Sequence, residues 1–276
     1  MTFSNQIVRL MQNHCQRCHH EGGTAPFSLM TYEEVRPWAR SIKLRTGQRS
    51  RPDAMPPWYI EKDSGIQQFQ DDMSLSDAEI AKIAAWVDSG APRGNPADMP
   101  KLPAAEDAST WKIGTPDLVV NYPTFHMPAT GPDLYGTLEA PFGTTEDRYI
   151  KAMEIRPGNR RIVHHVVMYA IEPDAGPNTP EGGVNLHEYA VGKYGDTFAD
   201  NTGRLLKAGT KIRFDMHYYA SGEEQTDQTE LGIILYPKGY TPKYNVQSLS
   251  FRNLPNDELD VQPNSIARHD GYFRLT

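Results

Sequence analysis

Two cysteines three residues apart, followed at once by a histidine, constrain this chain more than any other feature. The segment reads Cys15-Gln16-Arg17-Cys18-His19, and its two cysteines are the only ones in the 276 residues. Thiols at this spacing reach two vinyl groups of one porphyrin, and the turn between them brings the histidine beneath the iron. A disulfide or a thioredoxin-type redox pair would not need the histidine and favours a βαβ context, which the sequence does not show. We therefore predict a c-type haem held by Cys15, Cys18 and His19.

A second ligand for the iron is expected from a proline-rich loop further along the chain. Met55 is followed directly by Pro56 and Pro57. Paired prolines stiffen the backbone, so a thioether there can be held at the iron with little further loss of entropy. A His/Met pair raises the potential of a haem, which suits electron transfer. We favour Met55 over Met30 and Met73, while a methionine that only fills the core is the other interpretation.

Helical patterns surround the cysteine motif. Residues 4–14 form an amphipathic pattern that runs straight into the motif. The pairs Thr31 with Glu34 and Ser76 with Glu79 have the spacing of capping boxes, and the second pair precedes an apolar run of helical period. These patterns predict an all-α domain over residues 1–92, which resembles a small cytochrome c.

The rest of the chain predicts strands. Residues 93–116 are rich in proline, alanine and charge without a regular period, and we interpret them as a linker. Short runs of β-branched and aromatic residues follow, separated by Asn, Gly and Pro. The pattern predicts an antiparallel β-sandwich or jelly roll over residues 117–276, so the fold class is α + β with two domains. The expected strands are 117–121, 149–155, 162–171, 211–219 and 231–236.

Three histidines in the predicted strands are candidate metal ligands: His164, His165 and His217. Neighbouring residues on a regular strand point to opposite faces, so the first two can reach one ion only if the strand is bulged or ends there. Three neutral imidazoles suit copper or zinc, although paired histidines also occur on polar surfaces without a metal. His187 is a weaker candidate.

Two segments with these histidines, RIVHHVVMYA and IRFDMHYYASGEEQTDQTELGIILY, resemble the N-terminal half of the copper type II, ascorbate-dependent monooxygenases. That family includes peptidylglycine α-hydroxylating monooxygenase and dopamine β-monooxygenase. The segments MPPWYIEK, MSLSDAEIAKIAAWVDSGAP and GNPADMP resemble the cytochrome c-like domain fused in front of bacterial members. The resemblance implies a type 2 copper that handles electron transfer, bound by His164, His165 and His217.

One departure from the family concerns its second copper, where dioxygen and substrate meet. That copper needs a His-X-His motif and a methionine from a second β domain, and no His-X-His occurs in this chain. The catalytic residues are therefore unknown. We expect a fragment, a protein completed by another chain, or a protein that moves electrons without hydroxylating. Glu188, Asp215 and Tyr218 are candidates to orient the imidazoles.

The expected function is that of an exported c-type cytochrome that passes electrons from its haem to this copper, as the electron-transfer half of a copper-dependent monooxygenase. The alternatives are a plain electron-transfer cytochrome, or a subunit of a larger extracytoplasmic complex, whose β domain docks partners without copper. Expected partners are a redox protein or small reductant and, for a protein completed by another chain, the chain that supplies the second copper domain.

Composition and the cysteine motif limit the partners and the compartment expected for this protein. A net charge of −7 without a basic cluster argues against nucleic acid as a partner. No apolar run approaches the roughly 20 residues that span a bilayer. Because haem is attached to such motifs outside the cytoplasm, we expect a periplasmic or otherwise extracytoplasmic protein whose signal peptide is absent from this chain.

Overall fold

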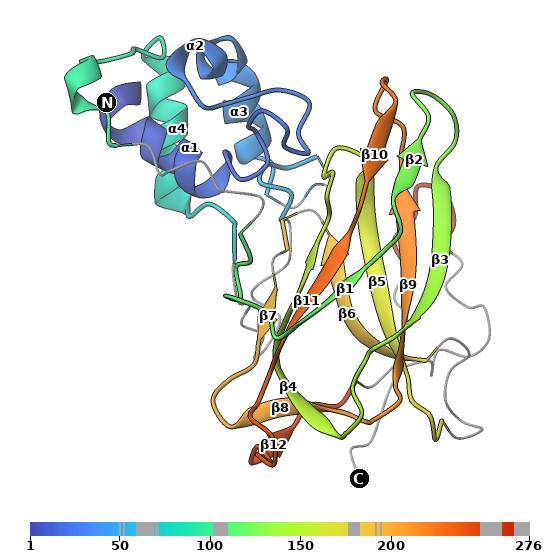
Figure 1. The fold of residues 1–276 in the computed structure, drawn as a ribbon. Coiled ribbons are helices and arrows are strands. Elements are labelled where there is room, and N and C mark those ends of the chain that lie inside the picture. The colour runs from blue at the N-terminus through green and yellow to red at the C-terminus, as the bar shows by residue number, and fades with distance from the viewer. Residues whose placement is uncertain are drawn as a thin grey trace.

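Helices occupy the N-terminal part of the chain, and antiparallel strands occupy the rest (Figure 1). The computed structural model describes residues 1–49, 51, 53–58, 69, 72–101, 110–175, 183–190, 192–193, 195–248 and 261–267. The segment MPPWYIEK, residues 55–62, therefore lies partly outside the described residues. Residues 102–109 of the predicted linker lie outside them entirely. No helix in the described part of the chain has the length and apolar character needed to cross a bilayer.

Within its described residues, the helical part contains four α-helices and three short turns of other helical types. The predicted helix over residues 4–14 consists of a π-helical turn, whose first amides donate to the carbonyls of Pro92 and Arg93, followed by a regular helix. The elements are η1 Phe3–Ile7, α1 Val8–His14, α2 Tyr32–Val35, η2 Arg36–Trp38, α3 Ala39–Thr46, α4 Asp77–Asp88 and η3 Pro96–Asp98. These helices enclose a core of their own, which includes Phe3, Ile7, Leu10, Met11, Val35, Ile83 and Trp86.

Both predicted capping boxes are confirmed. The Thr31 side chain accepts from the backbone amide of Glu34 at the start of α2, and the Glu34 side chain accepts from the Thr31 amide in return. The same exchange joins Ser76 and Glu79 at the start of α4, where Glu79 accepts from the Ser76 amide at 2.8 Å. Each box satisfies amide donors that the first turn of a helix leaves without a partner.

The second capping box also reaches the cysteine motif. Glu79 Oε1 lies 3.3 Å from Nε2 of His14, the last residue of α1. His14 Nδ1–H donates to the Met73 carbonyl, 3.1 Å away. His14 directly precedes Cys15, so the start of α4 and the loop before it hold the point where the motif begins.

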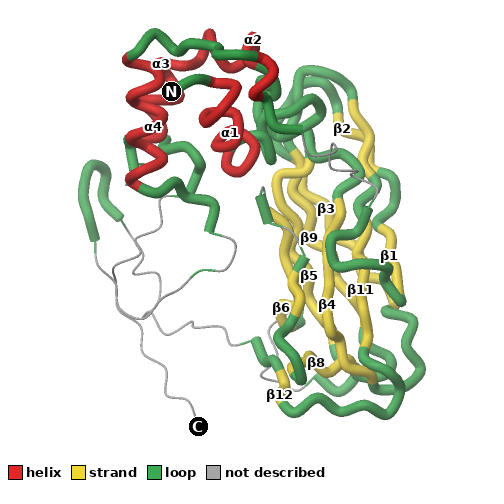
Figure 2. Tube along the Cα trace, turned by 90° about the vertical axis from the view of Figure 1, so that its left-hand side faces the viewer, coloured by secondary structure: helices red, strands yellow, loops and turns green. Residues whose placement is uncertain are grey.

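Two larger sheets and a two-stranded sheet of β10 with β2 make up the described β part, and Figure 2 shows the larger sheets from the side. The first has the order β1-β11-β4-β8-β12 with β7 on β4, and the second has the order β3-β9-β5-β6. Every pair is antiparallel except β8 with β12. The strands are β1 Leu118–Asn121, β2 Phe125–Met127, β3 Leu134–Pro141, β4 Arg148–Arg156, β5 Val163–Ile171, β6 Val184–Ala190, β7 Asp196–Thr197, β8 Thr202–Leu206, β9 Lys211–Tyr218, β10 Gln225–Asp227, β11 Glu230–Leu235 and β12 Tyr244–Asn245.

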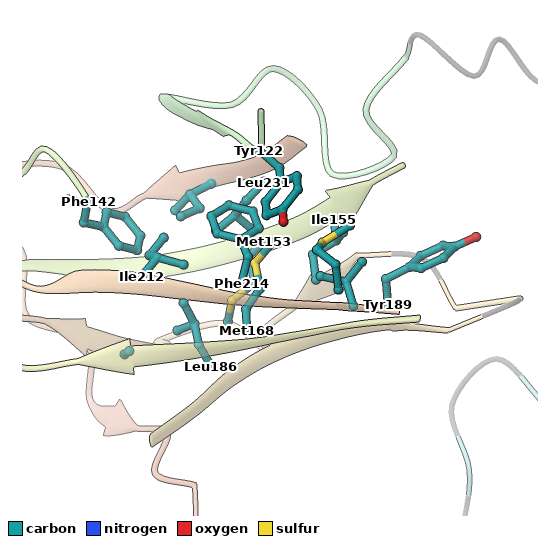
Figure 3. Packing of buried hydrophobic residues seen from close by; sticks show 14 of the residues in the cluster. Tyr122, Phe142, Met153, Ile155, Met168, Leu186, Tyr189, Ile212, Phe214 and Leu231 are labelled. Atoms are coloured by element: carbon teal, nitrogen blue, oxygen red, sulfur yellow. The ribbon is translucent and has the colours of Figure 1, made fainter. Parts of the chain in front are cut away.

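Both larger sheets contribute to one apolar core, an arrangement consistent with a β-sandwich. Met153 and Leu231 of the first sheet lie against Met168 and Phe214 of the second (Figure 3). Because side chains alternate along a strand, the burial of Phe214 and Met216 in β9 places His217 on the outer face of its sheet. The outer face of the second sheet is therefore the surface on which the candidate ligands can meet.

The predicted strands are all present within a residue or two of their expected ends, but several others were missed. Strands β3 and β6 complete the second sheet and carry Gly136, Pro141 and His187, which weaken a strand pattern. Pairing with β9 and β5 stabilises these segments despite their low intrinsic preference. In β3, half-buried and exposed side chains alternate, as expected for a sheet with one solvated face.

Replacing Ser76 by alanine tests the capping interaction that joins α4 to the cysteine motif. The change removes the side-chain acceptor for the Glu79 amide and should lower the free energy of unfolding by about 1 kcal/mol. Urea unfolding with an unchanged slope would measure it. Ser41→Ala, at an exposed position in α3, is the control and should have little effect. Equal stabilities of the two variants would contradict the interpretation.

Candidate functional site

The three predicted ligand histidines meet on the outer face of the second sheet. His164 and His165 lie on β5, and His217 lies on the neighbouring strand β9. The Nδ1 atom of His165 is 2.9 Å from Nδ1 of His164 and 3.3 Å from Nδ1 of His217. One ring nitrogen from each histidine lies within 4.8 Å of the others, close enough for a single ion, and no second such group occurs in the part of the chain that the structure describes.

A β-bulge brings the two adjacent histidines together. Val163 pairs with Tyr218, and the next paired residue of β5 is His165, opposite His217. His164 is thus an extra residue on β5 with no counterpart on β9. The sequence predicted that the two imidazoles could converge only through such an irregularity, and the structure confirms it. A bulge re-aims a side chain that would otherwise point to the far face.

The environment of His165 favours its neutral imidazole. Burial lowers the pKa of His165, and the charges that His217 and His164 would carry lower it further. The neutral form is the one that binds metal ions, since a protonated ring has no free lone pair. His164 is exposed and His165 half-buried, so the cluster is open to solvent on one side.

His217 is fixed by two neighbours that the sequence reasoning missed. Its Nε2–H donates to Asp133 Oδ2 at 2.8 Å, and its ring stacks on Tyr135 with 4.4 Å between ring centroids and 14° between the planes. Tyr135 is directly opposite His217 in the pairing of β3 with β9. No local pattern could have indicated these contacts, because they depend on the register of two strands about 80 residues apart.

The three side chains predicted to orient the imidazoles have polar partners other than the histidines. Asp215 accepts from Arg213 and Thr137 on the outer face. Tyr218 donates to Asp227 inside the molecule. Glu188 acts on His165 only through its charge, which raises the pKa of that ring.

Asp227 links the strands that carry the histidines. This carboxylate is buried and accepts from the Asn159 amide at 2.9 Å, from the Tyr218 hydroxyl at 3.1 Å and from the Thr229 hydroxyl at 2.8 Å. Asn159 lies in the turn before β5, and Tyr218 is the last residue of β9. A Cβ on Gly158 would lie 2.9 Å from the backbone of the segment that follows Asp227, so this close packing requires glycine. The buried carboxylate of Asp227 thus binds both the turn that precedes β5 and the end of β9 next to His217.

The cysteine motif forms a turn that continues from α1. The amide of Cys15 donates to the Met11 carbonyl, and the amides of Cys18 and His19 both donate to the Cys15 carbonyl. Both cysteines are free and half-buried. Burial, with a smaller effect of Cys18, raises the pKa of the Cys15 thiol to about 12. Burial also raises the pKa of Cys18, against the opposite effect of two nearby arginines.

His19 is oriented by the loop after the motif. Its Nδ1–H donates to the Phe27 carbonyl at 3.1 Å, which leaves Nε2 as the acceptor nitrogen of the neutral ring. The ring packs on Phe27, which stacks in turn on Trp38 with 4.2 Å between centroids. Burial lowers the pKa of His19 and favours the neutral form, while the bond to Phe27 has the opposite effect.

The methionine proposed as second iron ligand lies just beyond α3. The Met55 amide donates to the Arg45 carbonyl at 3.1 Å, and the Met55 side chain is 43% exposed. Met30 is half-buried, and Met73 lies against Gly192 of the β part. Met55 as the iron ligand stays a prediction.

The remaining histidines do not belong to the cluster of His164, His165 and His217 as far as the structure describes them. His187 is buried, and its Nδ1–H donates to Asp196 at 2.9 Å, so it has a role within the β part. His20 donates to the Gln16 carbonyl in the cysteine motif. His126 is exposed on β2, and His269 lies outside the described residues.

The cysteine motif borders the end of the sheet that carries the histidines. Arg17 donates to the Gly192 carbonyl at 3.3 Å, and Cys18 lines a pocket together with Arg160 and Tyr189 of the β part. Gly192 follows closely after Ala190, the residue of β6 that pairs with His165. The cysteine motif thus contacts the β part close to the strand that pairs with His165, through the Arg17 side chain and the Gly192 carbonyl.

A scan against protein-family models found no match for this chain, and a search of curated proteins also found none. The assignment of the site therefore depends on its geometry.

Removing the Tyr218 hydroxyl tests the role of Asp227 as a link between the histidine strands. Tyr218→Phe deletes one of three donors to a buried carboxylate and should lower the free energy of unfolding by about 2 kcal/mol. The matched control is Tyr219→Phe at the next position, whose hydroxyl has no hydrogen bond to any residue that the structure describes, and it should have a much smaller effect. Thermal or urea unfolding measures both, and similar losses would contradict the proposed link.

Proposed function

We propose that this chain is an electron-transfer protein with a covalent haem in its helical part and a copper ion in its β part. The observation that carries the proposal is the convergence of two imidazoles from the bulged end of β5 with a third from the neighbouring strand β9. Such a bulge disrupts a strand ladder, and bulges are enriched next to functional sites. The arrangement suits a metal better than it suits a surface histidine pair.

Copper fits the donor set of this site. His164, His165 and His217 present nitrogen donors only, and burial favours the neutral form of His165. A copper ion held by imidazoles exchanges one electron as it cycles between its two oxidation states. The protein supplies a fixed arrangement of Nδ1 atoms and a side open to solvent, since His164 is exposed. Zinc would fit the same donors but has no redox chemistry.

A c-type haem fits the residues of the cysteine motif. Cys15 and Cys18 are both free thiols, as thioether formation requires. His19 donates its Nδ1 proton to a backbone carbonyl, the usual arrangement for a histidine whose other nitrogen binds a metal. A haem with histidine and methionine ligands exchanges one electron at a raised potential, with Met55 as the proposed second ligand.

Membership of the copper type II monooxygenase family, with a cytochrome c-like domain over residues 1–92, is part of this proposal. The support is the resemblance of the segments around the three histidines and the cysteine-motif domain. The chain would act as the electron-transfer half in an extracytoplasmic compartment, with a redox protein or small reductant as electron source. Hydroxylation would need a second copper domain. The contact of Arg17 with Gly192 supports electron exchange within one chain.

Metal analysis tests the proposal directly. Protein produced with a haem-attachment system should contain one iron and one copper per chain, measured by elemental analysis together with copper EPR. The double variant His164→Ala, His165→Ala should lose copper and retain iron, whereas the exposed-histidine control His126→Ala should retain both. Iron without copper, even after copper loading, would contradict the copper assignment and favour a cytochrome whose β part only docks partners.

Thiol reactivity tests the haem assignment. In protein made without haem, both cysteines should alkylate more slowly than a free cysteine at about pH 8, because burial raises both pKa values and the thiolate is the reactive form. Cys15, with its pKa at about 12, should react slowly until the pH is raised much further. In protein matured with haem, neither cysteine should react, and the haem should stay with the denatured chain. Mass spectrometry after alkylation measures both results, and free thiols in the matured protein would overturn the assignment.

A further inference from the structure

Asp133 stands just before β3 at the edge of the histidine cluster. Its Oδ2 atom accepts the Nε2–H of His217 at 2.8 Å. The two side chains differ in exposure, with 10% of the His217 side chain and 51% of the Asp133 side chain accessible to solvent. Among the described residues of the cluster, His217 is the histidine that bonds a carboxylate, through Nε2, the ring nitrogen on the side away from His165.

This hydrogen bond decides which nitrogen of His217 faces the cluster. A neutral imidazole carries its proton on one nitrogen and a lone pair on the other. With the proton on Nε2 toward Asp133, the lone pair lies on Nδ1, which points at Nδ1 of His165 from 3.3 Å. The opposite tautomer would place a proton where a metal ion needs an electron pair.

The surrounding backbone holds the carboxylate in place. Leu134 pairs with Tyr218, and Tyr135 pairs with His217. Because side chains alternate along a strand, Asp133 and Tyr135 lie on the same face, one beside the edge of the imidazole and the other against its plane. Together they fix the ring in two directions.

An exposed ion pair alone would not account for this arrangement, because such pairs contribute little to stability. We infer that Asp133 is a positioning residue for the metal site, which fixes the tautomer and the orientation of His217 so that its Nδ1 binds the ion. This inference rests on the proposed metal site and assigns to it a residue that does not itself touch the ion. Carboxylates that hold metal-ligating histidines in this way are common in metalloproteins.

Copper affinity of the full haem-attached chain tests the inference, measured by competition with a chelator of known affinity. Asp133→Ala should weaken copper binding by roughly 10- to 100-fold. Asp133→Asn should lose less, because its amide oxygen still accepts the Nε2 proton. The control Asp215→Asn removes a charge from the same face, at a residue bonded to Arg213 and Thr137 and to no imidazole, and should leave the affinity within about twofold. Unfolding midpoints should be similar for all variants, because Asp133 is half exposed.

Nitrogen NMR of the metal-free protein provides a readout that no metal influences. The His217 signals should show the Nε2–H tautomer in the unmodified chain and a mixture of both tautomers in Asp133→Ala. Equal copper affinity and an unchanged copper EPR spectrum in Asp133→Ala would overturn the inference while leaving the metal site intact. An unmodified chain that binds no copper would overturn the proposed function instead, and the NMR comparison would still show whether Asp133 fixes the ring.

Discussion

The candidate site depends on one irregular position in the pairing of β5 with β9. An extra residue at His164 turns two neighbouring imidazoles to one side of the sheet, where a regular strand would separate them by its full thickness. Beyond the bulge, the pairing of β5 with β9 is regular down to Ile171, and β5 contributes Val166, Met168 and Ala170 to the core. The departure from regular pairing with β9 is therefore confined to the end of the strand, where it costs little core packing and places the candidate ligands near solvent.

A bulge at a strand end needs support, and buried polar contacts supply it. Asp227 accepts three hydrogen bonds in the interior, from the turn before β5, from the end of β9 and from its own loop. An unpartnered carboxylate at this depth would be strongly unfavourable, and each of the three donors lowers that cost. Because one carboxylate binds both the turn before β5 and the end of β9, it holds the two segments on either side of the bulge in place.

Features that depend on neighbours in sequence were predictable, and those that depend on strand register were not. The capping box of Ser76 with Glu79 and the strand around His165 follow from local patterns, and the structure confirms both. The convergence of His164 with His165 could be predicted only as a condition, since a period of two residues does not disclose a bulge. The contact of Asp133 with His217 joins residues 84 positions apart and follows from the pairing of β3 with β9. Since β3 itself reads weakly as a strand, no local pattern leads to that carboxylate.

The position of the histidines at the end of the sheet also explains why the helical part matters to the site. Many positions on the outer face of the second sheet could carry metal ligands. The histidines lie where β5 pairs with the end of β6, next to the described residues that follow this strand. Among these residues, Gly192 accepts from Arg17 of the cysteine motif, and the motif is held in turn by His14 and the start of α4. The loop before α4 also reaches the β part directly, since Met73 lies against Gly192. The two candidate sites therefore adjoin each other through the segment around Gly192, and this adjacency is the structural observation behind the proposal that the two parts work together.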